Sequence, residues 1–254
     1  MKLAVPLLVS LVACGGKSAP PPPPKPVESP TKIAPRVPVE DTSEPEEGVT
    51  IVNARGHMEK EAIEAGLQPH QQEMMDCYLK KVGRRRWLGG HVKIHWDIKK
   101  DGTISKVVLS AESDLGAWPI EKCLIEIARA ASFDKPVGGD ADFDVPLQFD
   151  ARQSVLPWDE DQSLKAVGGQ LIKLEACAKH EKAKHEIEHI PVPEDVTITM
   201  YVGPHGKAQS VGFSSDKSEI HEKWAECAEK AALAWRLPDP KGVIAKLAIR
   251  YRGR

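Results

Sequence analysis

The chain of 254 residues carries 35 Lys and Arg against 37 Asp and Glu, which gives a formal net charge of −2. This charge balance, with only 5% aromatic residues, provides no electrostatic or stacking basis for nucleic-acid binding. About 200 residues remain beyond the apolar start and a proline-rich segment, enough for one large domain or two small ones.

The amino terminus has the pattern of a secretory signal peptide. Met1-Lys2 precedes an apolar run over residues 3–13, which is shorter than the ~20 residues of a membrane-spanning helix. The run ends in Leu11-Val12-Ala13-Cys14, which resembles the lipobox of bacterial lipoproteins; an ordinary signal peptide beside a chance cysteine is the alternative. The resemblance implies removal of residues 1–13 and acylation of Cys14, which would anchor the protein to a membrane. Gly15, in place of an aspartate, favours the periplasmic face of the outer membrane.

Residues 14–50 are expected to form a disordered linker that begins at the lipidated cysteine. Pro20 to Pro24 are consecutive, and further prolines recur among lysine, glutamate, serine and threonine. This composition favours polyproline II structure and buries too little apolar surface to offset the loss of chain entropy. At about 3.1 Å per residue, the linker could hold a folded body up to roughly 100 Å from the membrane.

The remainder of the chain contains an internal repeat. The matched pairs are Val92 with Val196, Gly102 with Gly206, Cys123 with Cys227 and, after a four-residue adjustment, Cys77 with Cys177. Two copies are too few for a solenoid, so the repeat indicates duplicated globular domains. We expect the first domain at residues 51–151 and a divergent second copy at residues 158–254.

Each copy has the same predicted order of elements. In the first, residues 69–82 and 120–131 have apolar residues at helical spacing, while 91–98, 104–109 and 143–149 alternate as strands do. A turn at residues 99–102 joins the first two strands into a hairpin. The sequence therefore predicts an α+β fold of two tandem helix-strand-strand-helix-strand domains. Each would be a small antiparallel sheet covered by two helices on one face.

The five cysteines divide into Cys14 and two in each repeat. An exported protein meets an oxidising environment, in which cysteines pair. Four cysteines allow three pairings. A duplicated domain should keep its bridge within itself, which predicts Cys77–Cys123 and Cys177–Cys227; four buried free thiols are the alternative.

Residues 58–150 resemble the AgmX/PglI carboxy-terminal domain family. The resemblance lies in Cys77-Tyr78, Leu88-x-Gly90-x-Val92, Trp96-x-Ile98, Asp101-Gly102, Ser113-x-Leu115, Cys123, Phe133-x-x-Pro136-x-Gly138-Gly139 and Pro146-x-x-Phe149. It implies a fold similar to the carboxy-terminal domain of TonB. It also implies a cell-envelope protein, since some members of the family are tied to gliding motility or envelope force transmission. The second copy keeps both cysteines and the hairpin but lacks the tyrosine.

The expected function is therefore non-catalytic, lipid-anchored binding or scaffolding in the cell envelope. The expected contacts are a membrane, through the lipid, and another envelope protein, with no cofactor, nucleic acid or small-molecule substrate. TonB binds a partner by adding an edge strand to another sheet. By analogy, residues 104–109 are expected to form an exposed edge at which Ser105 and Val107 are open to pairing, with the closing strand as the other edge. A purely structural spacer is the alternative.

Two further motifs have a functional and a structural interpretation. His185-Glu186-Ile187-Glu188-His189 fits the helical zinc signature H-E-x-x-H, so His185 and His189 are candidate ligands and a zinc-dependent hydrolase is the enzymatic alternative. Pro191 and Pro193 follow directly, and a charged helix end is the preferred interpretation. The basic cluster consists of Lys80, Lys81, Arg84, Arg85 and Arg86. It fits a solvated helix end, where cations are favoured, or contact with anionic lipid or an acidic partner.

Overall fold

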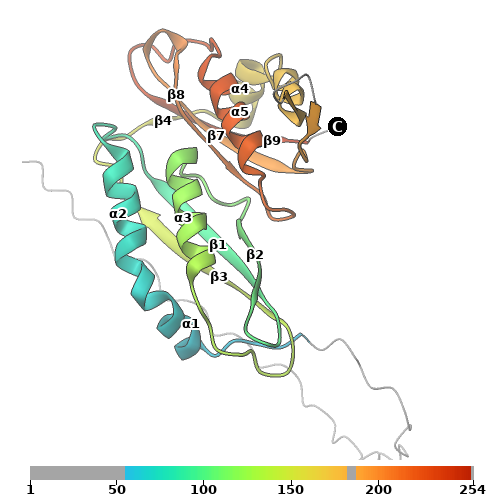
Figure 1. Ribbon diagram of the computed structural model, residues 1–254. Coiled ribbons are helices and arrows are strands. Elements are labelled where there is room, and N and C mark those ends of the chain that lie inside the picture. Colours follow the sequence, from blue (N-terminus) through green and yellow to red (C-terminus); the bar gives the residue numbers. More distant parts are fainter. Residues whose placement is uncertain (1–54, 182–186, 253–254) are drawn as a thin grey trace, which may run out of the picture. The chain divides into compact units, whose positions relative to one another are not determined.

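A computed structural model of the chain describes residues 55–181 and 187–252 (Figure 1). All of these residues belong to one compact unit, residues 51–254. The expected signal peptide, Cys14 and the linker lie outside the described residues. Within the described ranges, no helix is both long and apolar enough to cross a bilayer. Helices and strands are both well represented, which confirms the α+β class.

The first half of the unit is a three-stranded antiparallel sheet with helices on one face. Its elements are α1 (Lys60–Leu67), the short 3-10 helix η1 (Gln68–His70), α2 (Gln71–Val82), β1 (Gly90–Ile98), β2 (Ile104–Leu109), α3 (Trp118–Ala130) and β3 (Ala141–Phe149). The strand order is β2-β1-β3. Figure 1 shows α2 and α3 side by side over this sheet.

The alternation of β1 explains this packing. Its residues that face the helices are Val92, Ile94, Trp96 and Ile98, and none is more than 1% exposed. The indole N–H of Trp96 donates to the backbone oxygen of Ala128 over 3.0 Å, which ties the strand to α3. Tyr78 of α2 stacks on Phe149 at the end of β3, with ring centroids 4.6 Å apart. The period of two in β1 thus brings both helices onto one face of the sheet.

The second half is built on a four-stranded sheet of order β4-β9-β7-β8. Its elements are β4 (Leu156–Pro157), α4 (Glu160–Val167), the 3-10 helix η2 (Leu171–Ala178), β5 (Lys179–Glu181), β6 (Ile187–His189), β7 (Val196–Val202), the 3-10 turn η3 (Pro204–Gly206), β8 (Ala208–Ser214), α5 (Glu222–Leu233) and β9 (Ala245–Tyr251). β4 pairs with β9 in parallel, and β7 pairs antiparallel with both of its neighbours.

Two expectations for the second half are wrong. The sheet is mixed rather than wholly antiparallel, because the segment between the halves adds β4 alongside β9. The element that carries Cys177 is a 3-10 helix rather than an α-helix, and it runs directly into β5 at Lys179. The structure nevertheless forms both bridges that the repeat predicts. Cys77–Cys123 joins α2 to α3, and Cys177–Cys227 joins η2 to α5.

The described part of the HEIEH segment is a strand rather than the expected helix end. Ile187–His189 is strand β6, and it pairs antiparallel with Lys179–Glu181. Pro191 disfavours helical structure in Ile190, the residue after β6, so a helix is not favoured at this point of the chain. His185 lies outside the described residues, and His189 is exposed. Across the described ranges, no three His, Cys, Asp or Glu side chains are grouped to hold a metal.

Candidate functional site

The edge strands of the two sheets are the candidate sites for strand addition, because an edge strand presents unpaired backbone N–H and C=O groups. In the first sheet the edges are β2 and β3, as the sequence predicts. In the second sheet they are β8 and the two-residue strand β4. Which of these edges is free decides where a partner strand could bind.

The expected binding edge, β2, is already occupied. The N–H of Val107 donates to Oε1 of Glu219 over 2.9 Å, and the oxygen of Leu109 accepts from the N–H of Ser215 over 2.8 Å. The other carboxylate oxygen of Glu219 lies 2.7 Å from Arg129. The expectation that Val107 is open to a partner is therefore wrong, because the second half of the chain takes up its backbone donor.

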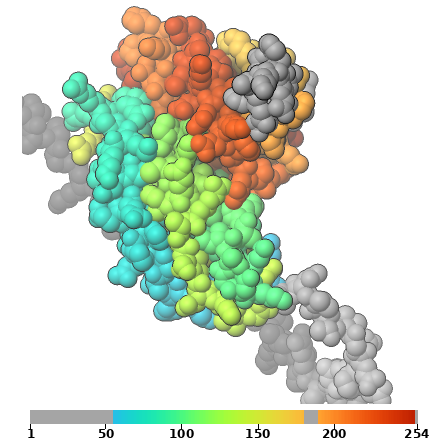
Figure 2. Space-filling view, in the orientation of Figure 1, coloured from blue at the N-terminus to red at the C-terminus, as the bar shows by residue number. Residues whose placement is uncertain are grey.

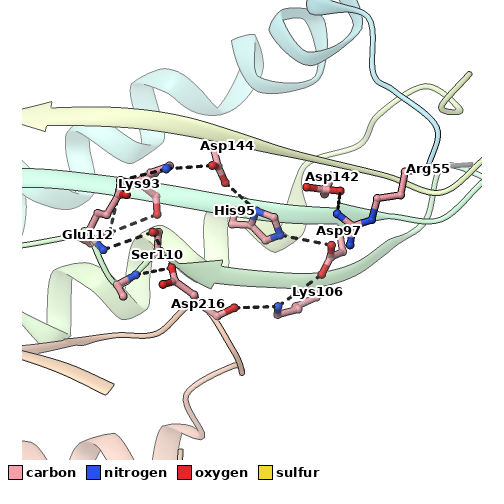
Figure 3. Close-up of polar contacts among 12 residues, drawn as sticks. Arg55, Lys93, His95, Asp97, Lys106, Ser110, Glu112, Asp142, Asp144 and Asp216 are labelled. Carbon is pink, nitrogen blue, oxygen red and sulfur yellow. Dashed lines mark hydrogen bonds and ion pairs between the residues drawn. The ribbon is translucent and has the colours of Figure 1, made fainter. Parts of the chain in front are cut away.

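Asp216 extends this contact beyond the end of β2. Its Oδ1 accepts from the N–H of Ala111 and from the hydroxyl of Ser110, both over 2.8 Å. The ammonium group of Lys106 donates to the backbone oxygen of Asp216 over 3.3 Å (Figure 3). One aspartate thus binds both the strand β2 and the turn that follows it.

The corresponding edge of the second sheet, β8, is occupied in the same manner by the first half. The N–H of Phe213 donates to Oε2 of Glu121 over 2.8 Å. The hydroxyls of Ser210 and Ser214 donate to the backbone oxygens of Gly116 and Ser113, over 2.7 and 3.2 Å. Figure 2 shows the helix α3, in green, packed against the orange and red surface of the second half.

Glu121 is the buried charge of this interface. Its side chain is sealed from solvent, and Oε1 accepts from the N–H groups of Gly116 and Ala117 over 2.9 and 3.1 Å. Burial raises the pKa of Glu121 to about 7, although the three backbone N–H groups oppose that rise. The carboxylate links the first turn of α3 to β8.

The remaining long edge, β3, has Pro146 at its middle. Lys93 of β1, which stands opposite Pro146, directs its backbone away from β3: its oxygen accepts from Ser110 N–H over 2.8 Å, and its N–H donates to the Ser113 hydroxyl over 2.9 Å. Backbone groups of successive strand residues alternate between the two neighbours. The backbone of Pro146 therefore points outward from the sheet, where a missing N–H breaks no bond of the ladder.

Asp144 and Gln148 pair across the sheet with His95 and His91. By the same alternation, the backbone groups of Asp144 and Gln148 point outward from the sheet. In the described part of the chain, no backbone group outside the sheet hydrogen-bonds residues 143–148. The start of β3 is different, because Arg55 lies 2.5 Å from the Asp142 carboxylate and Gly56 N–H bonds the Asp140 oxygen over 2.8 Å. The open edge therefore runs from about residue 143 to 148.

A charged face lies beside this edge, on the side of the sheet away from the helices (Figure 3). His95 lies 2.7 Å from Asp144 and 3.4 Å from Asp97, and Lys93 lies 3.2 Å from Asp144 and 3.1 Å from Glu112. Partial burial raises the pKa of Asp144. The hydrogen bonds from His95 and Lys93 lower that pKa by more than burial raises it, so the net shift of the pKa is downward. Asp144 is therefore a stable anion on the open edge.

The basic cluster does not form a single patch. Arg85 turns back on its own helix, where its guanidinium donates to the oxygens of Val82, over 3.1 Å, and Lys81. Lys80 lies 3.5 Å from Asp76 one turn earlier. Lys81, Arg84 and Arg86 are exposed. Arg85 thus caps the carbonyl end of α2, which matches the helix-end interpretation for that residue.

The chain was compared with family models, with curated proteins and with solved structures. None of them matches. An assignment of function therefore has to rest on the geometry of the chain itself. That geometry depends on three acidic residues that the sequence analysis did not single out: Glu121, Asp216 and Glu219. Of these, Glu121 had a local signal, as an acidic residue in the first turn of a helix beside an apolar residue.

Proposed function

We propose that this protein is a non-catalytic, lipid-anchored binding or scaffolding module of the bacterial cell envelope, which takes up another envelope protein along strand β3. The lipid on Cys14 and the linker to residue 50 would tether the folded unit to a membrane. Both disulfides suit an oxidising compartment outside the cytoplasm. Two tandem copies of one domain, descended from a duplication, would form the folded unit.

The observation that carries the proposal is the contrast between the three long edges. β2 and β8 have backbone donors bound by carboxylates of the other half, whereas residues 143–148 of β3 bond no described backbone outside their sheet. An incoming strand would pair with the outward N–H and C=O groups of Asp144 and Gln148 and with the oxygen of Pro146. Such main-chain pairing supplies affinity in strand addition, while alternate side chains supply specificity.

The two faces of β3 indicate the chemistry of the partner strand. On the helix side, Val145 and Leu147 are half-buried, so an added strand would cover them with apolar side chains. On the opposite side, Asp144 is the acidic residue of the open edge, and it favours a basic side chain in the partner. We therefore expect an extended segment that alternates apolar and basic residues.

Asp144→Pro tests this mode of binding, because it removes an outward N–H that the sheet itself does not use. Asp144→Ala is the matched control, since it removes the same carboxylate but keeps the N–H. Each variant is expressed in the native envelope and crosslinked, and its partners are identified by mass spectrometry. We expect Asp144→Ala to retain the crosslinked partner and Asp144→Pro to lose it, with Cys77–Cys123 intact in both.

Two results would redirect the proposal. Equal capture by both variants would exclude strand addition at β3 and point to Lys81, Arg84 and Arg86. The absence of any crosslinked protein with the unaltered chain would instead favour a structural spacer.

A further inference from the structure

The contacts that cover β2 and β8 have a common chemistry. Val107 N–H ends on Glu219, and Phe213 N–H ends on Glu121, so each edge strand gives a backbone donor to a carboxylate of the other half. The two strands occupy corresponding positions in the repeat. A direct backbone bond, from Ser215 N–H to the Leu109 oxygen over 2.8 Å, lies between them.

A carboxylate terminates a sheet in a way that another strand does not. It accepts hydrogen bonds but has no donor of its own when ionised, so it satisfies an edge N–H without offering a new edge. Charged groups placed against an edge are a known protection against unwanted pairing. Val107 and Phe213 would each be available to a strand if the carboxylates withdrew.

We propose that the contact between the two halves is an autoinhibitory latch, in which Glu121 and Glu219 occupy backbone donors of β8 and β2 and keep both edges from accepting a partner strand. The identity of the ligand as a strand rests on the proposed function, but the latch itself does not. Opening withdraws the two carboxylates from the backbone donors and exposes two further edges of the kind that β3 already presents.

The interface has a buried centre, around Glu121 and Tyr201, and a polar outer part that can open. Its outer part consists of ion pairs at least partly in contact with water: Lys122 with Glu222 and Glu226, Arg129 with Glu219, and Lys246 with Asp114. Such pairs contribute little each and weaken with salt. A cleft of about 300 Å³ also lies beside β2, between Val107, Trp118 and Ile220. The halves are therefore not close-packed along this side.

Hydrogen exchange of the full mature protein tests the latch. Glu219→Ala removes the acceptor of Val107 N–H, and Glu121→Gln turns one oxygen of the buried carboxylate into a donor. Glu64→Ala is the control, because Glu64 is also an exposed glutamate paired with one cation, Lys60, and both belong to helix α1 of the first half. We expect amide exchange in residues 104–109 and 208–214 to rise about tenfold or more in the two interface variants, since an edge hydrogen bond is lost.

Exchange in β1 and β7 should not change, because these central strands are paired on both sides. Unchanged exchange in β2 and β8 of Glu219→Ala would overturn the latch. Glu219 is itself surface-accessible, so this variant remains informative even if Glu121→Gln does not fold.

A synthetic peptide that copies residues 208–214 tests inhibition itself. Its binding is measured by fluorescence anisotropy against the unaltered chain, Glu219→Ala, and Glu219→Ala combined with Asp144→Pro. We expect binding to both Glu219→Ala proteins and at least tenfold weaker binding to the unaltered chain. A variant that opens by exchange but binds no better than the unaltered chain would overturn autoinhibition. Binding that persists with Asp144→Pro is independent of β3, so it separates this proposal from the proposed function.

Discussion

Gly212 lies against Glu121 so closely that a Cβ atom at residue 212 would stand 2.1 Å from Oε1 and 2.3 Å from Oε2. The bare backbone of β8 at this point lets the carboxylate of α3 reach the N–H of Phe213. A glycine within a strand pattern often marks such a close approach. Here it marks the place where the two halves of the chain are joined.

Gly212→Ala should therefore destabilise the fold. The added methyl group would force the buried carboxylate or the backbone of β8 to move, and we expect a loss of about 2–4 kcal/mol in the free energy of unfolding. Urea denaturation followed by circular dichroism measures this loss. Gly169→Ala is the matched control, because no atom lies within 4 Å of a Cβ at Gly169. Equal stability of the two variants would contradict the close contact.

The raised pKa of Glu121 predicts a specific dependence of stability on pH. Its pKa is about 7 in the fold and 4.5 in the reference state, so the folded protein binds the proton more readily than the unfolded chain. The stabilising contribution is therefore fully present below about pH 4.5 and is lost as the pH rises through about 7. Between those limits, the free energy of unfolding should fall by on the order of 3 kcal/mol relative to Glu121→Gln. Parallel pH profiles of the two proteins would contradict this assignment.

Tyr201 supplies a second buried link between the halves. Its hydroxyl donates to the backbone oxygen of Gly89 over 2.6 Å, and its ring lies 4.8 Å from that of Trp87. Tyr201→Phe should lower the free energy of unfolding by about 1–3 kcal/mol, because the oxygen of Gly89 loses a buried partner. Thermal unfolding should remain a single transition in the unaltered chain. Two separate transitions there would show that the halves fold independently.

The two disulfides and the lipid anchor can be checked together on the protein from its native envelope. Peptide mapping without reduction should join Cys77 to Cys123 and Cys177 to Cys227.

Cys14→Ala should release the protein from membranes or block signal processing, because acylation anchors the protein to the membrane. Unchanged membrane fractionation of that variant would contradict the lipoprotein assignment.

The sequence predicts the local elements better than the contacts between them. The alternation from Val92 to Ile98 and the turn at Asp101-Gly102 suffice for the hairpin, and the repeat suffices for both cysteine pairs. The prediction of a helix end is wrong for Ile187–His189, because histidine and glutamate spacing cannot distinguish a helix from a strand without its partner, Lys179–Glu181.

The occupation of the β2 edge by the second half could not be predicted from the local sequence pattern. Val107 and its acceptor Glu219 are distant in sequence, and nothing near either residue indicates that they meet. The parallel strand β4 contains two residues, one of them Pro157, so it has too few positions to show alternation. Only the helix after it carries a signal, the capping box of Asp159 and Gln162.

The most direct test of the central claim is to ask which strand touches the partner in the native envelope. A photo-crosslinking residue placed at Gln148, on the open edge of β3, is compared with one at Ser105, on β2; both side chains are exposed. We predict a specific protein adduct from position 148 and none from position 105. An adduct from position 105 alone would contradict the assignment of β3 as the binding edge.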